Sequence, residues 1–249
     1  MTPLSILAPA QAALTGTVPR VDFHMHTIWT DGHNTVLEMH RAAITCGLNA
    51  ILFSEHARRT SNDWFMKFAD QVRNISADRC HAWVGAECKV LNFHGEIDAS
   101  SAILDACDLV MASVHRFPDR NGDGMLRFAD ISHEEAVEIE MGLMLAVLEN
   151  PAVDILGHPF GISRTRFKKD PTEDQFRAVI KKAAVSGVAF EINSQYHSNP
   201  NDLIRWCREA GAIISLGSNA HKVNEVGDIV RMLEGQVVPA WSHETARHK

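Results

Sequence analysis

The stretch V-D-F-H-M-H at residues 21–26 is a short, mostly apolar run of the kind that forms β-strands, and it ends in His24 and His26. Side chains along a strand alternate between its two faces, so these two imidazoles share one face. Together they offer two neutral nitrogen donors to one metal ion. The stretch therefore predicts a β-strand that carries a pair of candidate metal ligands.

Similar runs recur along the chain, at residues 50–56, 81–91, 109–115, 154–158, 188–193 and 213–217. Runs that are apolar on successive residues are typical of strands buried on both faces of a parallel sheet. Segments with helical periodicity lie between them, at residues 35–46, 64–78, 132–149, 172–186, 201–210 and 224–233. The chain is thus predicted to alternate strand and helix.

Residues at the helix ends support this pattern. Ser132 precedes Glu135 and Thr172 precedes Gln175 at the spacing of a capping box, and glycines follow three helical runs, at positions 47, 187 and 211. Seven strand–helix units without a linker rich in proline and glycine predict one closed or nearly closed (β/α) barrel over residues 21–235. A doubly wound sheet is the alternative, but no G-x-G-x-x-G motif follows the first strand.

Both ends of the chain lie outside this pattern. Residues 1–20 hold an apolar run that Pro3 and Pro9 interrupt and that no basic residue precedes, so we expect a loosely ordered leader. Residues 236–249 are expected to form a C-terminal tail. The sequence has no run of about 18 uncharged apolar residues, so it predicts no transmembrane helix. Five cysteines without a C-x-x-C pair argue against a disulfide framework and favour a reducing compartment, the cytoplasm.

Composition limits the classes of partner. The 24 basic and 31 acidic side chains give a formal charge of −7, which argues against a protein that coats duplex nucleic acid. Fourteen histidines against a single tyrosine point instead to chemistry that uses imidazole.

Residues that can bind metal recur at the carboxyl ends of the predicted strands. In chain order they are His24 and His26, His56, Glu87, His115, His158, and finally Asn219 and His221 after the seventh strand. Because these ends share one face of a parallel barrel, we expect the side chains to meet in one pocket. Glu87 can bridge two ions, and Asp31 can add an oxygen ligand from the loop after the first strand. Several histidines with one or two carboxylates suit zinc, manganese or iron better than calcium or magnesium.

With these residues the chain resembles the polymerase and histidinol phosphatase (PHP) family of metal-dependent phosphoesterases. The matching segments are V-D-F-H-M-H-T-x-x-T-D-G at 21–32, F-S-E-H at 53–56, G-A-E at 85–87, S-V-H at 113–115, G-H-P at 157–159, E-I-N at 191–193 and S-N-A-H at 218–221. The resemblance implies a distorted (β/α)7 TIM-like barrel with two or three divalent transition-metal ions.

By resemblance, His24, His26, Glu87 and residue 219 hold the first ion. Glu87 bridges to a second ion, which His115 and His158 also bind, while Asp31, His56 and His221 hold a third. The family commonly has S-D-A-H where this chain has Asn219. A neutral amide in place of a carboxylate weakens the first site or changes its preferred ion.

The resemblance implies a phosphoesterase. Two metal ions about 3.5–4 Å apart can share a bridging hydroxide that attacks phosphorus in line. We therefore expect hydrolysis of a small phosphomonoester, with Glu87 and His115 as catalytic residues. Cations must also bind the other phosphate oxygens, and Arg116 and Arg164 are the preferred candidates for this role.

Three other functions remain open. A nuclease-like activity on nucleotides or short single strands, attacked from an end, would use the same ions, and Trp29 and Trp64 could then stack bases. An amidohydrolase-type barrel also begins with H-x-H, but it ordinarily has a carbamylated lysine and a final-strand aspartate. A catalytically silent metal-binding or regulatory barrel is made credible by Asn219.

Residues 119–130 need a separate interpretation. They carry oxygen ligands at the first, third, fifth and twelfth places and glycine at the sixth, as in an EF-hand calcium loop. The segment follows a strand and ends in Asp130 where the motif has glutamate. We interpret it as a tight polar loop, with calcium binding as a minor alternative.

Overall fold

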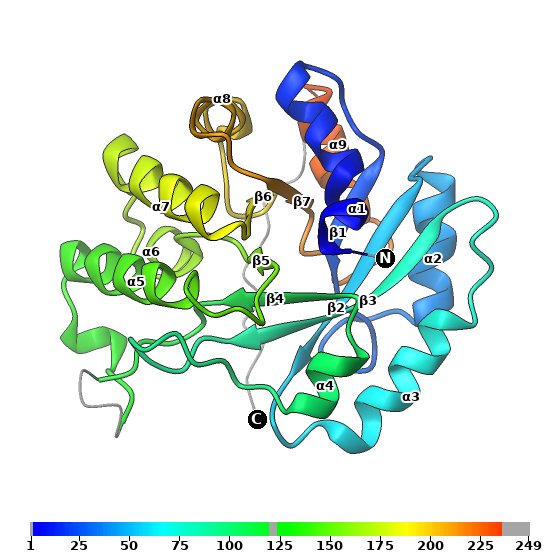
Figure 1. The fold of residues 1–249 in the computed structure, drawn as a ribbon, viewed down its shortest axis with the longest axis horizontal. Helices are drawn as coiled ribbons and strands as arrows, with labels where there is room; N and C mark the ends of the chain where they lie inside the picture. Colours follow the sequence, from blue (N-terminus) through cyan, green and yellow to red (C-terminus); the bar gives the residue numbers. More distant parts are fainter. Residues whose placement is uncertain (1, 120–123, 236–249) are drawn as a thin grey trace.

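The structure, a computed structural model, describes residues 2–119 and 124–235. Seven parallel strands form one sheet in chain order, and the helices lie around the outside of the strands (Figure 1). The strands are β1 (Val21–Met25), β2 (Ala50–Ala57), β3 (His81–Lys89), β4 (Leu109–Ser113), β5 (Ile155–Leu156), β6 (Ala189–Asn193) and β7 (Ile214–Gly217). The main helices are α2 (Val36–Thr45), α3 (Asn62–Arg73), α5 (His133–Val147), α7 (Glu173–Ser186), α8 (Pro200–Ala210) and α9 (Asp228–Leu233).

The sheet curls until its first and last strands meet. Just past the end of β7, the carbonyl oxygen of Ala220 accepts a hydrogen bond from the backbone N–H of His26 at 2.8 Å, and the N–H of Ala220 donates to the carbonyl oxygen of His24 at 3.1 Å. Asp22 supports this seam, because its carboxylate accepts hydrogen bonds from the N–H groups of Ser218 and Gly227, each at 2.9 Å. The seam makes the sheet a nearly closed barrel, which confirms the predicted fold class.

Several predicted helix ends are confirmed. Ser132 and Thr172 each form a complete capping box with the residue three places later, so orphan N–H groups in the first turns of α5 and α7 are satisfied. Gly187 and Gly211 end α7 and α8 in the left-handed conformation. After residue 20, two short α-helices were not predicted, α4 (Ser101–Ala106) and α6 (Gly161–Thr165).

β5 is shorter than the sequence indicates. We expected a strand over residues 154–158, but only Ile155 and Leu156 have strand geometry. The backbone leaves the sheet after them, and His158 has a φ of 24°, which is rare for a residue with a side chain. The early turn points His158 into the mouth of the barrel.

The expectation of a loosely ordered segment at residues 1–20 is wrong. Residues 3–15 form α1 (Pro3–Leu7) and the 3₁₀ helix η1 (Ala8–Thr15), in which Ile6, Leu7, Ala10 and Ala13 are buried. The Gln11 side-chain amide donates to the carbonyl oxygen of Ile214 at 2.8 Å and accepts from its N–H at 3.0 Å. The apolar run therefore packs against the start of β7. The predicted tail at residues 236–249 lies outside the described residues.

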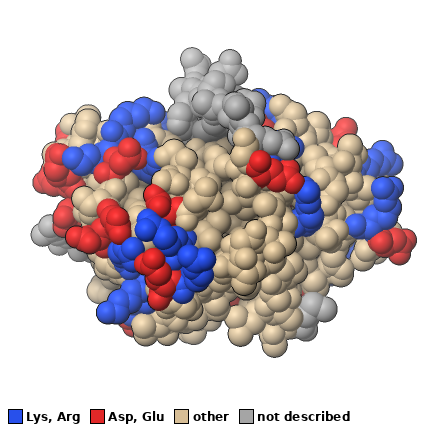
Figure 2. Space-filling view, turned by 90° about the horizontal axis from the view of Figure 1, so that it is seen from above, with Lys and Arg blue, Asp and Glu red and all other residues tan. Residues whose placement is uncertain are grey.

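The outer surface of the barrel carries charges of both signs. The face that includes α7, α8 and α9 shows basic and acidic side chains in the same clusters (Figure 2). Arg177, for example, pairs with Glu173 at 2.6 Å and with Glu209 at 2.7 Å. No helix of the described residues is long and apolar enough to cross a membrane.

Candidate metal centre

The carboxyl ends of the strands bring the predicted ligands together. His24 lies on β1 and His26 directly after it, His56 on β2 and Glu87 on β3, whereas the other ligands lie in the loops that follow β1, β4, β5 and β7. His24, His26, Glu87, His158 and Asn219 are buried. The register pairs His56 with Glu87 across β2 and β3, so these two side chains lie at the same level of the barrel.

Glu87 is the centre of this group. Both of its carboxylate oxygens face imidazoles. Oε2 lies 2.9 Å from His56 Nδ1, 3.5 Å from His26 Nε2 and 3.6 Å from His24 Nε2. Oε1 lies 2.8 Å from His158 Nε2 and 3.2 Å from His115 Nε2. Glu87 thus connects histidines from four different parts of the sheet.

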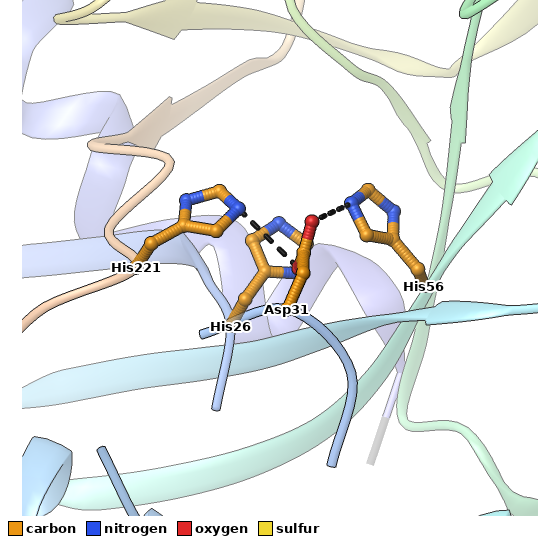
Figure 3. A group of neighbouring side chains, drawn as sticks. All are labelled: His26, Asp31, His56 and His221. Carbon is orange, nitrogen blue, oxygen red and sulfur yellow. Dashed lines mark ion pairs between the residues drawn. The ribbon is translucent and has the colours of Figure 1, made fainter. Parts of the chain in front are cut away.

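A second group forms around Asp31. Its carboxylate lies between His56 and His221, with Oδ2 3.4 Å from His56 Nε2 and Oδ1 3.4 Å from His221 Nε2 (Figure 3). The ring of His26 lies close to both, with its centroid 4.4 Å from that of His56 and 4.5 Å from that of His221. These four side chains are close enough to bind one ion.

The grouping differs from the one that the family resemblance implies. Among the described residues, histidine and carboxylate ligand atoms cluster in three sets: His26, Asp31, His56 and His221; His24, His26 and Glu87; and His56, Glu87 and His115. His26 and His56 therefore each face two sets. His158 contacts Glu87 but belongs to none of the three.

Asn219 is held in a fixed orientation. Its Oδ1 lies 3.2 Å from His26 Nε2, while its Nδ2 donates to Gln195 Oε1 at 3.0 Å. The amide therefore turns its oxygen toward the candidate ligands. Asn219 also has a φ of 51°, a left-handed conformation that asparagine tolerates better than most residues.

The loop that carries Asp31 is fixed by a buried carboxylate. Glu55 accepts hydrogen bonds from the N–H of Thr27 at 2.8 Å and from the hydroxyl of Thr27 at 2.6 Å, and the hydroxyl of Thr30 also donates to it. Gly32 lets the loop return close to β1, because a Cβ there would lie 2.5 Å from the carbonyl oxygen of His26. Together these features direct Asp31 toward His56 and His221.

Glu191 is a site residue to which the sequence analysis gave no role. It lies on β6, and its Oε1 lies 2.8 Å from His24 Nδ1, while its Oε2 accepts a hydrogen bond from the backbone N–H of His158. A carboxylate on one ring nitrogen leaves the other nitrogen facing the metal position, as in many metal sites. Gly217 makes room for it, since a Cβ there would overlap Glu191. The sequence signal was an acidic residue within an apolar strand.

The electrostatics of the centre favour positive charge. Burial by itself lowers the pKa of His24, but the carboxylates of Glu191 and Glu87 raise it to about 10. Burial also opposes the charged form of His56, and Glu87 and Asp31 raise its pKa to about 10. His115 is different, because burial lowers its pKa to about 4 despite Glu87. The carboxylates therefore create a field that can stabilise cations.

These residues fit divalent transition-metal ions. Glu87 Oε2 is buried and close to three imidazoles, but it makes no hydrogen bond with any residue that the structure describes. The Nε2 atoms of His24 and His26 lie 3.2 Å apart. Two ligands that are each about 2.0–2.1 Å from a tetrahedral zinc ion lie at about this separation. Converging nitrogens beside an unsatisfied carboxylate oxygen are the arrangement that such an ion requires.

The two candidate arginines have different surroundings. Arg164 is on α6, where Nε pairs with Asp170 at 2.8 Å and a terminal nitrogen donates to Ser198 at 2.8 Å. Arg116 directly follows His115, is exposed and forms no ion pair with any described residue. Arg116 is therefore better placed than Arg164 to meet an anion at the mouth.

Trp29 and Trp64 pack on each other. Their rings stack with centroids 6.1 Å apart, and Trp29 Nε1 donates to Gln71 at 2.7 Å. Each ring therefore has one face covered by the other ring. The suggested calcium loop cannot be followed throughout, because residues 120–123 lie outside the described part of the chain; its last residue, Asp130, pairs with Arg127 at 2.8 Å.

Known proteins are similar to this chain over most of its length. The family model of the PHP domain matches residues 22–195. A probable phosphatase of Photobacterium profundum is 31% identical over 227 residues, which cover 84% of this chain and 80% of that protein. A probable phosphatase of Vibrio atlanticus is 29% identical over 241 residues, covering 88% and 85%.

A solved structure shares the fold. The histidinol phosphate phosphatase of Lactococcus lactis, in complex with zinc, L-histidinol and phosphate, matches with a TM-score of 0.61 and 20% identity, over 86% of this chain and 93% of that one.

Proposed function

This chain belongs to the PHP domain family, and we propose that its metal centre hydrolyses a small phosphomonoester. It is a metal-dependent phosphoester hydrolase, as its relatives are named probable phosphatases. The observation that carries the proposal is the buried Glu87 carboxylate, which faces five imidazoles at one mouth of the barrel. The ligand set suits two or three ions of zinc, manganese or iron.

The chain's own residues bind the metal ions and provide positive charge for the substrate. Bound divalent metal ions would activate a water molecule and offset the negative charge of the phosphate. Glu87 connects the ligand sets, and His115, whose side chain is 24% exposed, lies where a substrate can reach it. Arg116 is proposed to bind phosphate oxygens. Arg164 would have to leave Asp170 to do the same, so we assign it a lesser role.

The proposal is tested by metal analysis together with hydrolysis of phenyl phosphate. We expect the purified protein to carry at least about one transition-metal ion per chain, to lose activity when the metal is chelated and to regain it when manganese or zinc is restored. The rates of hydrolysis of a panel of phosphorylated metabolites then rank them as substrates. Protein that binds no metal and hydrolyses no ester after restoration would contradict the proposal.

An Asn219→Asp variant is expected to bind its most weakly held ion about ten times more tightly than the wild type. The change adds a negative charge 3.2 Å from His26 Nε2, although Gln195 must then turn its amide to donate to the new carboxylate. Competition with a chelating dye measures the affinity, and Asn224→Asp, at an exposed position, is the control. Equal affinities in the variant and the wild type would show that residue 219 binds no ion.

We also propose a cytoplasmic location. All five cysteines are free, as expected in a reducing compartment.

A further inference from the structure

Three basic residues lie at or just past the ends of neighbouring strands, close in sequence to the metal ligands: Arg58 after β2, Lys89 as the last residue of β3 and Arg116 after β4. Lys89 is two residues beyond Glu87, so both side chains lie on the same side of β3. At about 3.3 Å per residue, Lys89 begins about 6.6 Å farther toward the mouth than Glu87. The sequence analysis gave Lys89 no role.

Arg58 directly follows the last residue of β2, at the end of the strand that pairs with β3. His56 pairs with Glu87 and Ala57 with Cys88 across β2 and β3, so Arg58 continues this register toward Lys89. A turn then fixes it, because the N–H of Arg58 donates to the Ser61 hydroxyl at 3.1 Å and its carbonyl oxygen accepts from the N–H of Ser61 at 2.9 Å.

The charges of these three residues are not balanced by ion pairs. Arg58, Lys89 and Arg116 form none with any described residue, whereas the nearby Arg59 pairs with Glu96. The Lys89 side chain is half-buried, so it is partly removed from the water that would otherwise solvate its charge. Neighbouring cations without ion-pair partners, at the edge of a metal centre, point to an anionic ligand.

If the proposed function is correct, the reacting phosphate lies at the metal centre, where Arg116 adjoins His115. Lys89 and Arg58 then face the next part of the substrate. We propose that Lys89 and Arg58 form a second anion subsite, which binds a carboxylate or a further phosphate on the same substrate molecule. This inference rests on the proposed function and narrows its substrate class to phosphomonoesters with a second anionic group.

The test compares three esters on the metal-restored enzyme: phenyl phosphate, 3-carboxyphenyl phosphate and 1,3-phenylene bisphosphate. We expect kcat/KM for at least one doubly anionic ester to exceed that for phenyl phosphate by about tenfold or more, since charge-assisted hydrogen bonds are strong. The ester with the higher kcat/KM of these two shows whether the subsite prefers a carboxylate or a second phosphate. A Lys89→Gln variant should lose most of this preference, and an Arg58→Gln variant part of it. Lys181→Gln, an exposed substitution on α7, should keep it.

The outcomes separate this inference from the proposed function. If the wild type hydrolyses all three esters equally, or if Lys89→Gln slows all three by the same factor, the second subsite is refuted while the phosphoesterase stands. If no ester is hydrolysed, calorimetry with phenylphosphonate and 3-carboxyphenylphosphonate decides. Binding of the carboxylated compound about ten times more tightly by the wild type but not by Lys89→Gln supports the subsite, and equal binding refutes it.

Discussion

A Glu87→Gln variant is expected to lose phosphatase activity by a factor of about 10³ or more, because several kcal/mol of charge stabilisation in the transition state depend on the bound metal. The variant should also retain fewer metal ions per chain than the wild type. Glu87 is buried, and its two oxygens face imidazoles from β1, β2 and the loops after β4 and β5. An amide keeps the size of the side chain but removes the negative charge that faces these imidazoles.

Metal content and activity must be measured on the same preparation. A thermal melt of the metal-free protein shows whether the variant folds, and Glu138→Gln, an exposed substitution on α5, is the matched control. A folded Glu87→Gln variant with full metal content and near-normal turnover would mean that the carboxylate is not a ligand, and the centre would need another explanation.

A Glu191→Gln variant is expected to bind metal about 10–100 times more weakly, in the range typical of changes to residues that orient ligands. Glu191 contacts His24 Nδ1 and the backbone N–H of His158, and its Oε1 also accepts from Asn193 Nδ2 at 2.8 Å. Glutamine cannot accept all of these hydrogen bonds, because its amide nitrogen is only a donor. Both histidines should therefore lose their fixed orientation.

A positioning role makes a specific prediction for Glu191→Gln. Saturating metal should restore most of kcat, while the metal affinity measured with a chelating dye stays low. Glu209→Gln, on the outer surface where it pairs with Arg177, should change neither. If excess metal leaves kcat of Glu191→Gln far below that of the wild type, Glu191 acts in the reaction itself, and its role as a positioning residue is refuted.

Much of the fold could be predicted because strand and helix patterns are local. The capping boxes at Ser132 and Thr172 and the glycines at 187 and 211 specify helix ends through contacts within a few residues. The error at residues 1–20 has the opposite cause. Two prolines in an apolar run gave no local sign of order, and the packing depends on Gln11 meeting β7, more than 200 residues away.

The candidate site, too, could be predicted from the sequence only in part. Regular strand ends bring all nine predicted ligands to one mouth, but they do not say which ligand faces which. His26 and His56 each face two ligand sets because the loop with Asp31 folds back over β1, held there by Glu55. The orientation of Asn219 likewise depends on Gln195, in a loop after another strand.

The alternating parallel barrel, with histidines and acids at the carboxyl ends of its strands, could be predicted from the sequence alone. Side-chain alternation and parallel strands place such residues on one face. The three-dimensional structure was needed to show that Glu191 contacts His24 and His158 and that Asp31 lies between His56 and His221. It was also needed to show that Lys89 and Arg58, at the ends of paired strands, form no ion pair with any described residue. The reason is that hydrogen-bond partners and charge neighbours are set by distances and angles between segments far apart in the chain, which spacing along the sequence does not encode.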